Sequence, residues 1–168
     1  MPVFDRFKPT RTATFPAAYV IPADLGRAVE LLQLHGVEVS RLTADWRGEA
    51  QVFVVDKIER ANRVYQGHTR LRLAGRFELK KSNVSTGDYL VSTAQPLGIL
   101  IFHLLEPESE DGLATWNFLD PKIQLHKNYP ILKILEPLDC PSEIKESAAA
   151  DVVLIGPSTS LGMTDYNV

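Results

Sequence analysis

The chain has few residues that can bind a metal or attack a substrate: four histidines and one cysteine in 168 positions. His35 and Glu38 have a spacing that can hold zinc, but a zinc site needs a third protein ligand and an open position. His35 also ends a helical pattern before Gly36, and a histidine in the last helical turn suits the helix dipole. A structural role for His35 at the end of a helix is therefore favoured, and His35 and Glu38 remain only weak candidates for a metal site.

His68 and Trp116 are candidates for binding rather than for catalysis. His68 follows a turn glycine and is expected to hydrogen-bond a neighbour or, as the less favoured alternative, to contact a ligand. Trp116 follows an acidic loop and begins an aromatic patch. Cys140 is adjacent to an aspartate, and an anionic neighbour raises the pKa of a thiol instead of activating it. No catalytic residue is predicted in this chain.

Two strand–helix units would position these residues. In the first, a strand at 17–22 precedes a helical stripe at 24–35, and a second strand follows at 37–42. Strand, helix and strand over so short a stretch predict a βαβ unit, in which the two strands are parallel and the crossover is right-handed. The second unit has a strand at 89–92 and a helix at 96–105, the densest apolar segment of the chain.

The first residues of these helices suggest an anion site. Helix N-termini present free N–H groups, and ligands of parallel α/β sheets bind beyond the carboxyl ends of the strands. Asp24 precedes the first helix, and Thr93 and Gln95 precede the second. We expect these three residues to lie beyond those strand ends, where an anion such as a peptide carboxylate would bind.

The middle of the chain predicts an antiparallel hairpin. The stretch 51–56 contains four apolar residues in succession, at 52–55, and residues 70–81 alternate between apolar and charged side chains. The predicted fold class is therefore α+β (or α/β), with a mixed sheet of five to six strands, two main helices, one βαβ unit and the hairpin. Residues 1–16 are interpreted as a linker or edge segment, 17–136 as one globular domain, and 137–168 as a loosely structured tail.

Composition limits the partners that are expected. The formal net charge is −3, which argues against nucleic-acid binding. No stretch of about 18 apolar residues is present, so no membrane-spanning segment is predicted. Charge is uneven: residues 57–81 sum to +6 and residues 106–168 to −7. The favoured interpretation is that both charged segments form solvent-exposed faces that attract each other weakly. The alternative is that the basic hairpin contacts an acidic surface of a partner.

Several short strings occur in an order that resembles one protein family: AYVIP at 18–22, HGVEV at 35–39, YQGH at 65–68, GDYLV at 87–91 and LLEPESEDGL at 104–113. Together they resemble the region downstream of the catalytic domain in bacterial zinc carboxypeptidase-like proteins, of the carboxypeptidase A-like metallopeptidase family. The resemblance implies a zinc-dependent peptidase domain upstream as the partner, often in an exported protein. It places the zinc in that domain, so no cofactor is expected in this chain.

The sequence thus favours a non-catalytic C-terminal accessory domain that supports or caps a peptidase domain, or assists peptide substrate binding. The alternatives are an independent peptide- or glycan-binding module that uses Trp116, Tyr129 and the basic strand, and a small hydrolase with an unrecognised site.

Overall fold

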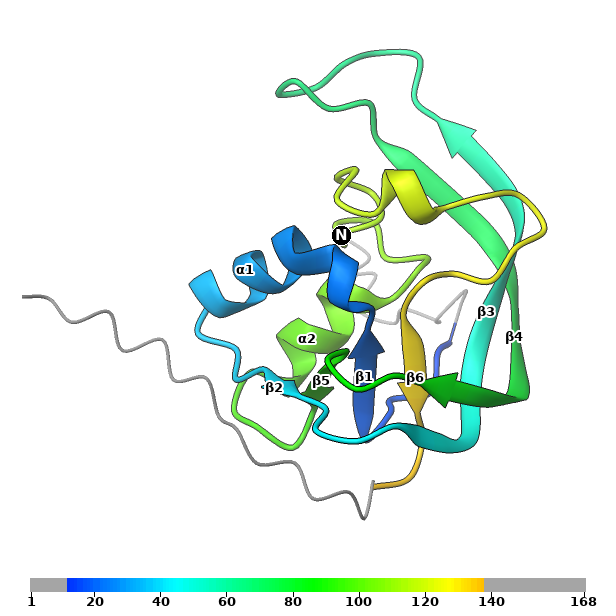
Figure 1. Cartoon of the computed structure of the whole chain (residues 1–168). Coiled ribbons are helices and arrows are strands. Elements are labelled where there is room, and N and C mark those ends of the chain that lie inside the picture. Colours follow the sequence, from blue (N-terminus) through cyan, green and yellow to red (C-terminus); the bar gives the residue numbers. More distant parts are fainter. Residues whose placement is uncertain (1–11, 138–168) are drawn as a thin grey trace, which may run out of the picture.

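The computed structural model describes residues 12–137. Expectations for 1–11 and 138–168, which include Cys140 and nearly all of the C-terminal tail, lie outside the described residues. The described chain forms six strands, two α-helices and two short 3-10 helices (Figure 1). In order these are β1 (Ala18–Ile21), η1 (Ala23–Leu25), α1 (Gly26–Leu34), β2 (Ser40–Arg41), β3 (Trp46–Arg60), β4 (Leu71–Val84), β5 (Tyr89–Ser92), α2 (Gly98–Leu105), η2 (Asp120–Lys122) and β6 (Leu132–Ile134).

All six strands belong to one sheet, in the order β2-β5-β1-β6-β3-β4. Every strand pairing in the described residues is antiparallel. The expected mixed sheet is therefore wrong, although a sheet with two helices remains consistent with an α+β protein.

The predicted βαβ unit is also wrong, because β1 and β2 are not neighbours. β5 lies between them and pairs antiparallel with both, so that Val20 and Ser40 each lie opposite Leu90. The second helix makes a similar connection, since β1 lies between β5 and β6. In each strand–helix–strand connection, one other strand therefore lies between the two connected strands, as in the split βαβ arrangement of ferredoxin-like folds. The β3–β4 hairpin extends the sheet beyond this arrangement.

Alternation along β1 divides the core into two clusters. Tyr19 and Ile21 face the helices and pack in the main cluster with residues from α1 and α2, so both helices cover the same face of the sheet. Ala18 and Val20 face the opposite side, in a smaller cluster with Leu42 and other residues. Both faces of this central strand are therefore buried, which explains why all four of its residues are apolar.

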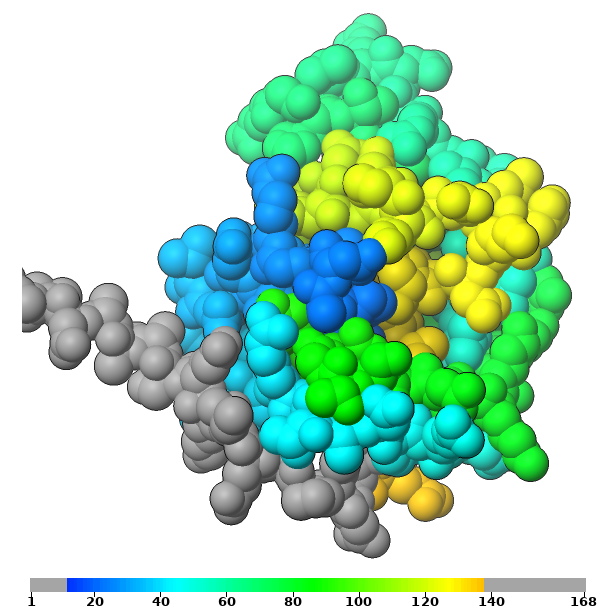
Figure 2. Space-filling model, viewed as in Figure 1, coloured from blue at the N-terminus to red at the C-terminus, as the bar shows by residue number. Residues whose placement is uncertain are grey.

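The β3–β4 hairpin is the longest feature of the sheet. Its antiparallel pairing, as expected from the sequence, runs from Trp46 opposite Val84 to Arg60 opposite Leu71. A register shift between Val55 and Lys57 places a bulge on β3. Figure 2 shows the tip of the hairpin projecting beside the loop of residues 110–120, which follows α2.

Of the two expectations for the ends of α1, the structure confirms one. Gly36 adopts φ +84°, the left-handed conformation expected where α1 ends. Asp24 does not cap α1, because it lies inside η1, whose cap position is Pro22 and carries no side-chain hydrogen bond.

Candidate functional site

The structure brings His68 and Trp116 together. His68 lies on the connection between β3 and β4, and Trp116 on the loop after α2. Their rings are 5.7 Å apart in an edge-to-face arrangement, and the Tyr65 ring lies 6.3 Å from the same indole. Such aromatic pairs contribute about 0.5–1.5 kcal/mol beyond the area they bury. The hairpin tip is therefore anchored on the Trp116 loop.

A tight turn positions His68. Tyr65 and His68 exchange two backbone hydrogen bonds of 2.9 Å, and the two residues between them, Gln66 and Gly67, have φ +51° and +81°. Positive φ at both central positions is the signature of a type I′ turn, whose twist matches that of a hairpin. Gly67 suits this turn because glycine adopts positive φ without strain. Gln66 also has positive φ, a conformation that costs a non-glycine residue free energy.

Asn117 fixes the other side of the site. It has φ +68°, and its side-chain amide donates to the carbonyl of Thr69 at 2.9 Å and to the carboxylate of Asp120 at 3.3 Å. The Trp116 indole N–H donates to Asp111. The side chains of Trp116 and Asn117 are therefore fixed by hydrogen bonds within the loop of residues 110–120 and by one to the connection between β3 and β4.

These residues form a small hollow, which we call the Trp116 pocket. Its volume is about 140 Å³, less than the ~300 Å³ at which small-molecule sites begin. It therefore fits one side chain or terminal group. An exposed guanidinium, an imidazole, an amide and two aromatic rings can together take a polar or anionic group beside an apolar surface. The lining residues are Arg27, His68, Trp116, Asn117 and Phe118.

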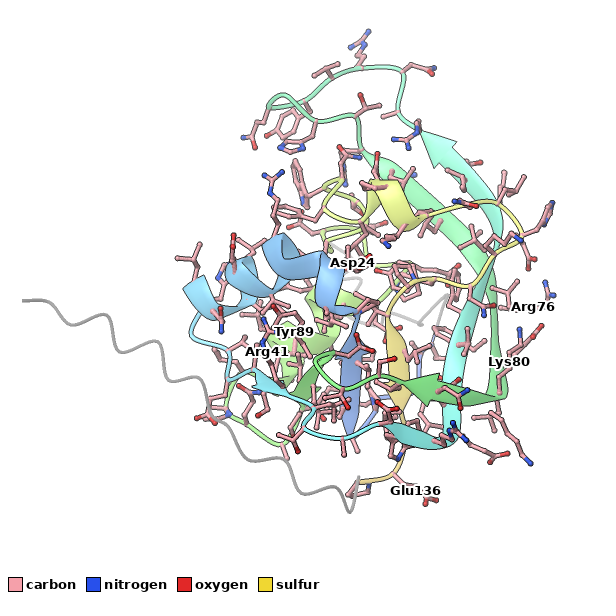
Figure 3. All side chains as sticks on the ribbon, in the orientation of Figure 1. Asp24, Arg41, Arg76, Lys80, Tyr89 and Glu136 are labelled. Carbon is pink, nitrogen blue, oxygen red and sulfur yellow. The ribbon has the colours of Figure 1, made fainter. Side chains whose placement is uncertain are left out.

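Asp24 and the pair Thr93 and Gln95 lie at opposite ends of the sheet. Because β1 and β5 are antiparallel, with Ala18 opposite Ser92, the residues that follow the two strands leave in opposite directions. Asp24 forms an ion pair with Lys122, and its label in Figure 3 marks the η1 end of the sheet. The structure therefore does not assemble these three residues into one site, and a binding role for each remains a prediction.

Thr93 and Gln95 each contact the backbone. The Thr93 hydroxyl donates to the carbonyl of Pro16 at 2.6 Å. The Gln95 amide oxygen accepts from the Glu38 N–H at 2.8 Å, and its amide nitrogen donates to the Glu38 carbonyl at 3.1 Å. These contacts tie the segment after β5 to the chain on either side of it.

His35 occupies the C-cap position of α1, and Glu38 lies in the following irregular segment. Within residues 12–137, no three histidine, cysteine, aspartate or glutamate side chains form a group that could hold a metal ion. No helix of this part is long and apolar enough to cross a membrane.

Some basic side chains of the hairpin pair with carboxylates of the hairpin itself, whereas Arg60 pairs with Asp120 of η2 at 2.8 Å. Arg76 contacts both Asp56 and Glu78, and Lys80 contacts Glu78 at 2.8 Å. Hydrogen bonds from Lys80 and Arg76 lower the pKa of Glu78. These exposed pairs, whose cations are labelled in Figure 3, contribute little to stability.

A buried polar cluster was missed at the sequence level. The Tyr19 hydroxyl donates to Glu106 at 2.6 Å, and the Lys133 ammonium lies 2.7 Å from the same oxygen, Oε1. Burial raises the pKa of Tyr19, and the Glu106 carboxylate raises it further. Burial lowers the pKa of Lys133, against the opposing effect of Glu106. The available signal was Lys133 itself, since it shares one face of a strand with the apolar Tyr129 and Ile131.

Comparison with known proteins finds relatives that match most of this chain but only a small part of their own length. No protein-family profile and no solved structure matches the chain. Carboxypeptidase 2 of the fungus Trichophyton rubrum is 26% identical over 127 residues, which cover 76% of this chain and 23% of the fungal protein. Carboxypeptidase 2 of Trichophyton tonsurans is 26% identical over 123 residues, 73% of this chain and 22% of that protein. The chain thus spans less than a quarter of these relatives, and it contains a carboxypeptidase-related region.

Proposed function

We propose that this chain is a non-catalytic accessory domain of a carboxypeptidase-like protein. The observation that carries the proposal is the extent of the similarity: most of this chain corresponds to less than a quarter of proteins named Carboxypeptidase 2. A segment of that size has the dimensions of one domain beside a larger one. The partner would be the peptidase domain of the same polypeptide, and zinc, if the parent enzyme uses it, would belong to that domain.

The Trp116 pocket is the part of this domain that would contact a peptide substrate. The hairpin tip and the Trp116 loop place the exposed Tyr65, 58% of whose surface is accessible, beside the partly exposed Trp116. Exposed aromatic side chains that are already fixed in place lose little entropy on binding, and for that reason they are frequent at recognition surfaces. The Arg27 guanidinium at the edge of the pocket would pair with a carboxylate of the peptide.

The first experiment tests whether the chain is catalytic. The purified chain is incubated with peptides that have free C-termini, with and without added zinc, and amino-acid release is measured. Its metal content is measured after dialysis. The proposal expects no release above the buffer control and no stoichiometric zinc. Peptide turnover that follows the purified chain, or one retained zinc per chain, would overturn it in favour of a hydrolase.

The second experiment tests the pocket through fluorescence. The chain has two tryptophans, so Trp46→Phe leaves Trp116 as the only indole. Titration with short peptides should change the emission of this variant, and the change should disappear when Arg27→Ala is added. Equal responses to a C-terminal acid and to its amide would contradict recognition of a carboxylate. A response to oligosaccharides in place of peptides would favour an independent glycan-binding module, because an aromatic ring can also stack on a sugar.

A further inference from the structure

A second pocket lies between β4 and the turn that follows α2. Its volume is about 400 Å³, within the ~300–1,000 Å³ typical of ligand sites. It shares no residue with the Trp116 pocket, and we call it the Glu106 pocket. Two aromatic rings and three carboxylates are among its lining residues: Thr12, Ala13, Phe77, Phe102, His103, Glu106, Glu108, Ser109 and Glu110.

Glu106 gives this pocket a fixed, buried carboxylate. Only 9% of its side chain is exposed, yet it lines the hollow. Tyr19 and Lys133 both contact the same oxygen, Oε1. The shortest contacts of both residues are thus to Oε1 and not to Oε2. Because each oxygen of a carboxylate can accept hydrogen bonds, Oε2 is the acceptor that a donor entering the pocket would meet.

Lys133 acts as a positioning residue for Glu106. Its side chain is 3% exposed, and its ammonium lies 4.3 Å from the centre of the Phe77 ring. The contact with Glu106 is short enough for an ion pair, but the ammonium has no well-aligned hydrogen-bond acceptor in the described part of the chain. A buried ion pair often stabilises less than apolar residues of the same volume. Its presence beneath an open pocket is therefore better explained by ligand binding than by stability.

The charge at the rim of the pocket defines the ligand. Arg70 donates to the backbone carbonyl of Glu110 at 3.0 Å, and no described residue is paired with the Glu110 carboxylate. Since Lys133 neutralises Glu106, the exposed Glu110 carboxylate supplies negative charge to the lining of the pocket. Phe77 and Phe102 provide apolar walls for an aliphatic stem and faces for a planar cation.

We propose that the Glu106 pocket binds a basic side chain of a polypeptide, and that an arginine fits it best. The guanidinium would donate to Glu106 Oε2 and to the Glu110 carboxylate, while its stem packs between Phe77 and Phe102. Arginine is favoured over lysine because its planar fork can donate to two carboxylates at once and can stack on a ring. This proposal is independent of the accessory-domain function.

The test uses the full chain and a blocked pentapeptide with a central arginine, compared with the same peptide carrying citrulline, which is uncharged but similar in shape. Calorimetry should show binding of the arginine peptide and at least about tenfold weaker binding of the citrulline peptide, as expected for a lost charged hydrogen bond. Glu106→Gln should weaken binding similarly, and Glu110→Gln by about threefold or more. Glu30→Gln, which removes the same charge from the exposed face of α1, should leave affinity unchanged.

The ligand has two sources that the experiment separates. Arg6, Lys8 and Arg11 precede the pocket residue Thr12 in the sequence, and their side chains have the required chemistry. If they occupy the pocket, their combined replacement by alanine should make the full chain bind the arginine peptide more tightly. If the source is another polypeptide, that variant and the parent chain should bind equally. Equal affinity for arginine and citrulline peptides, or no binding by either form of the chain, would overturn the proposal. Failure of Glu106→Gln to fold would leave the peptide comparison and Glu110→Gln decisive.

Discussion

The Tyr19–Glu106 hydrogen bond leads to a prediction that can be worked out in detail. Tyr19 is fully buried and donates to the carboxylate at 2.6 Å. Tyr19→Phe removes the donor but keeps the ring, so the core stays filled. A hydrogen bond to a charged group contributes about 1.5–3 kcal/mol. We therefore expect Tyr19→Phe to lower the free energy of unfolding by that amount at pH 7.

The same substitution should have a smaller effect at alkaline pH. Burial and Glu106 raise the pKa of Tyr19 far above its ordinary value, so the folded chain keeps the phenol protonated while the unfolded chain ionises near pH 10. A raised pKa stabilises the fold below pH 10 and loses that contribution as pH rises. At pH 11 the loss is about 1.4 kcal/mol. Phenylalanine does not ionise, so the difference in free energy of unfolding between the variant and the parent chain should be smaller at pH 11 than at pH 7 by about that amount.

Urea unfolding followed by circular dichroism at pH 7 and at pH 11 measures both effects. The opposing contribution of Lys133, whose lowered pKa favours the fold as pH rises, is present in both proteins and largely cancels in the comparison. Tyr65→Phe is the matched control, because Tyr65 is exposed, and it should change stability by less than about 0.5 kcal/mol at either pH. A Tyr19→Phe effect equal to that of the control, or a gap that does not narrow, would refute the reasoning.

Three further predictions concern the same fold. Lys133→Met should destabilise the chain by about 3–5 kcal/mol, because it leaves a buried carboxylate unpaired; adding Glu106→Leu together with Tyr19→Phe, so that the Tyr19 hydroxyl is not left without its acceptor, should restore most of the melting temperature. Gly75→Ala should destabilise the hairpin, since a Cβ there would lie 2.0 Å from the carbonyl oxygen of Val54; an unchanged melting temperature would contradict this close approach. Gln66→Gly should stabilise the chain by roughly 1 kcal/mol, because it relieves the positive φ, and chemical denaturation at neutral pH would show a decrease instead if the turn has another conformation.

Local features of the fold could be predicted because short-range patterns encode them. Apolar residues at helical spacing predicted both helices, which the structure places at Gly26–Leu34 and Gly98–Leu105. A continuous apolar run predicted the strand that the structure shows as β3, and alternation predicted the one that it shows as β4. The positive φ of Gly36 follows from its lack of a side chain.

The candidate sites were predictable only as separate residues. His68 and Trp116 were both identified from their residue types, but their ring contact depends on how the hairpin turn folds back onto the loop after α2. Glu106 was placed in an acidic loop, where a carboxylate is normally exposed. Its burial depends on Tyr19 and Lys133, which come from two other strands.

The sequence by itself determined which segments are helices and strands and which of their faces are apolar, because these depend on neighbours a few residues away. Only the tertiary structure decided that β5 lies between β1 and β2, since periodicity states which face of a strand is buried but not which strand lies beside it. The same holds for the two pockets. Each is built from segments far apart in the chain, and their proximity results from the packing of the whole sheet against its helices.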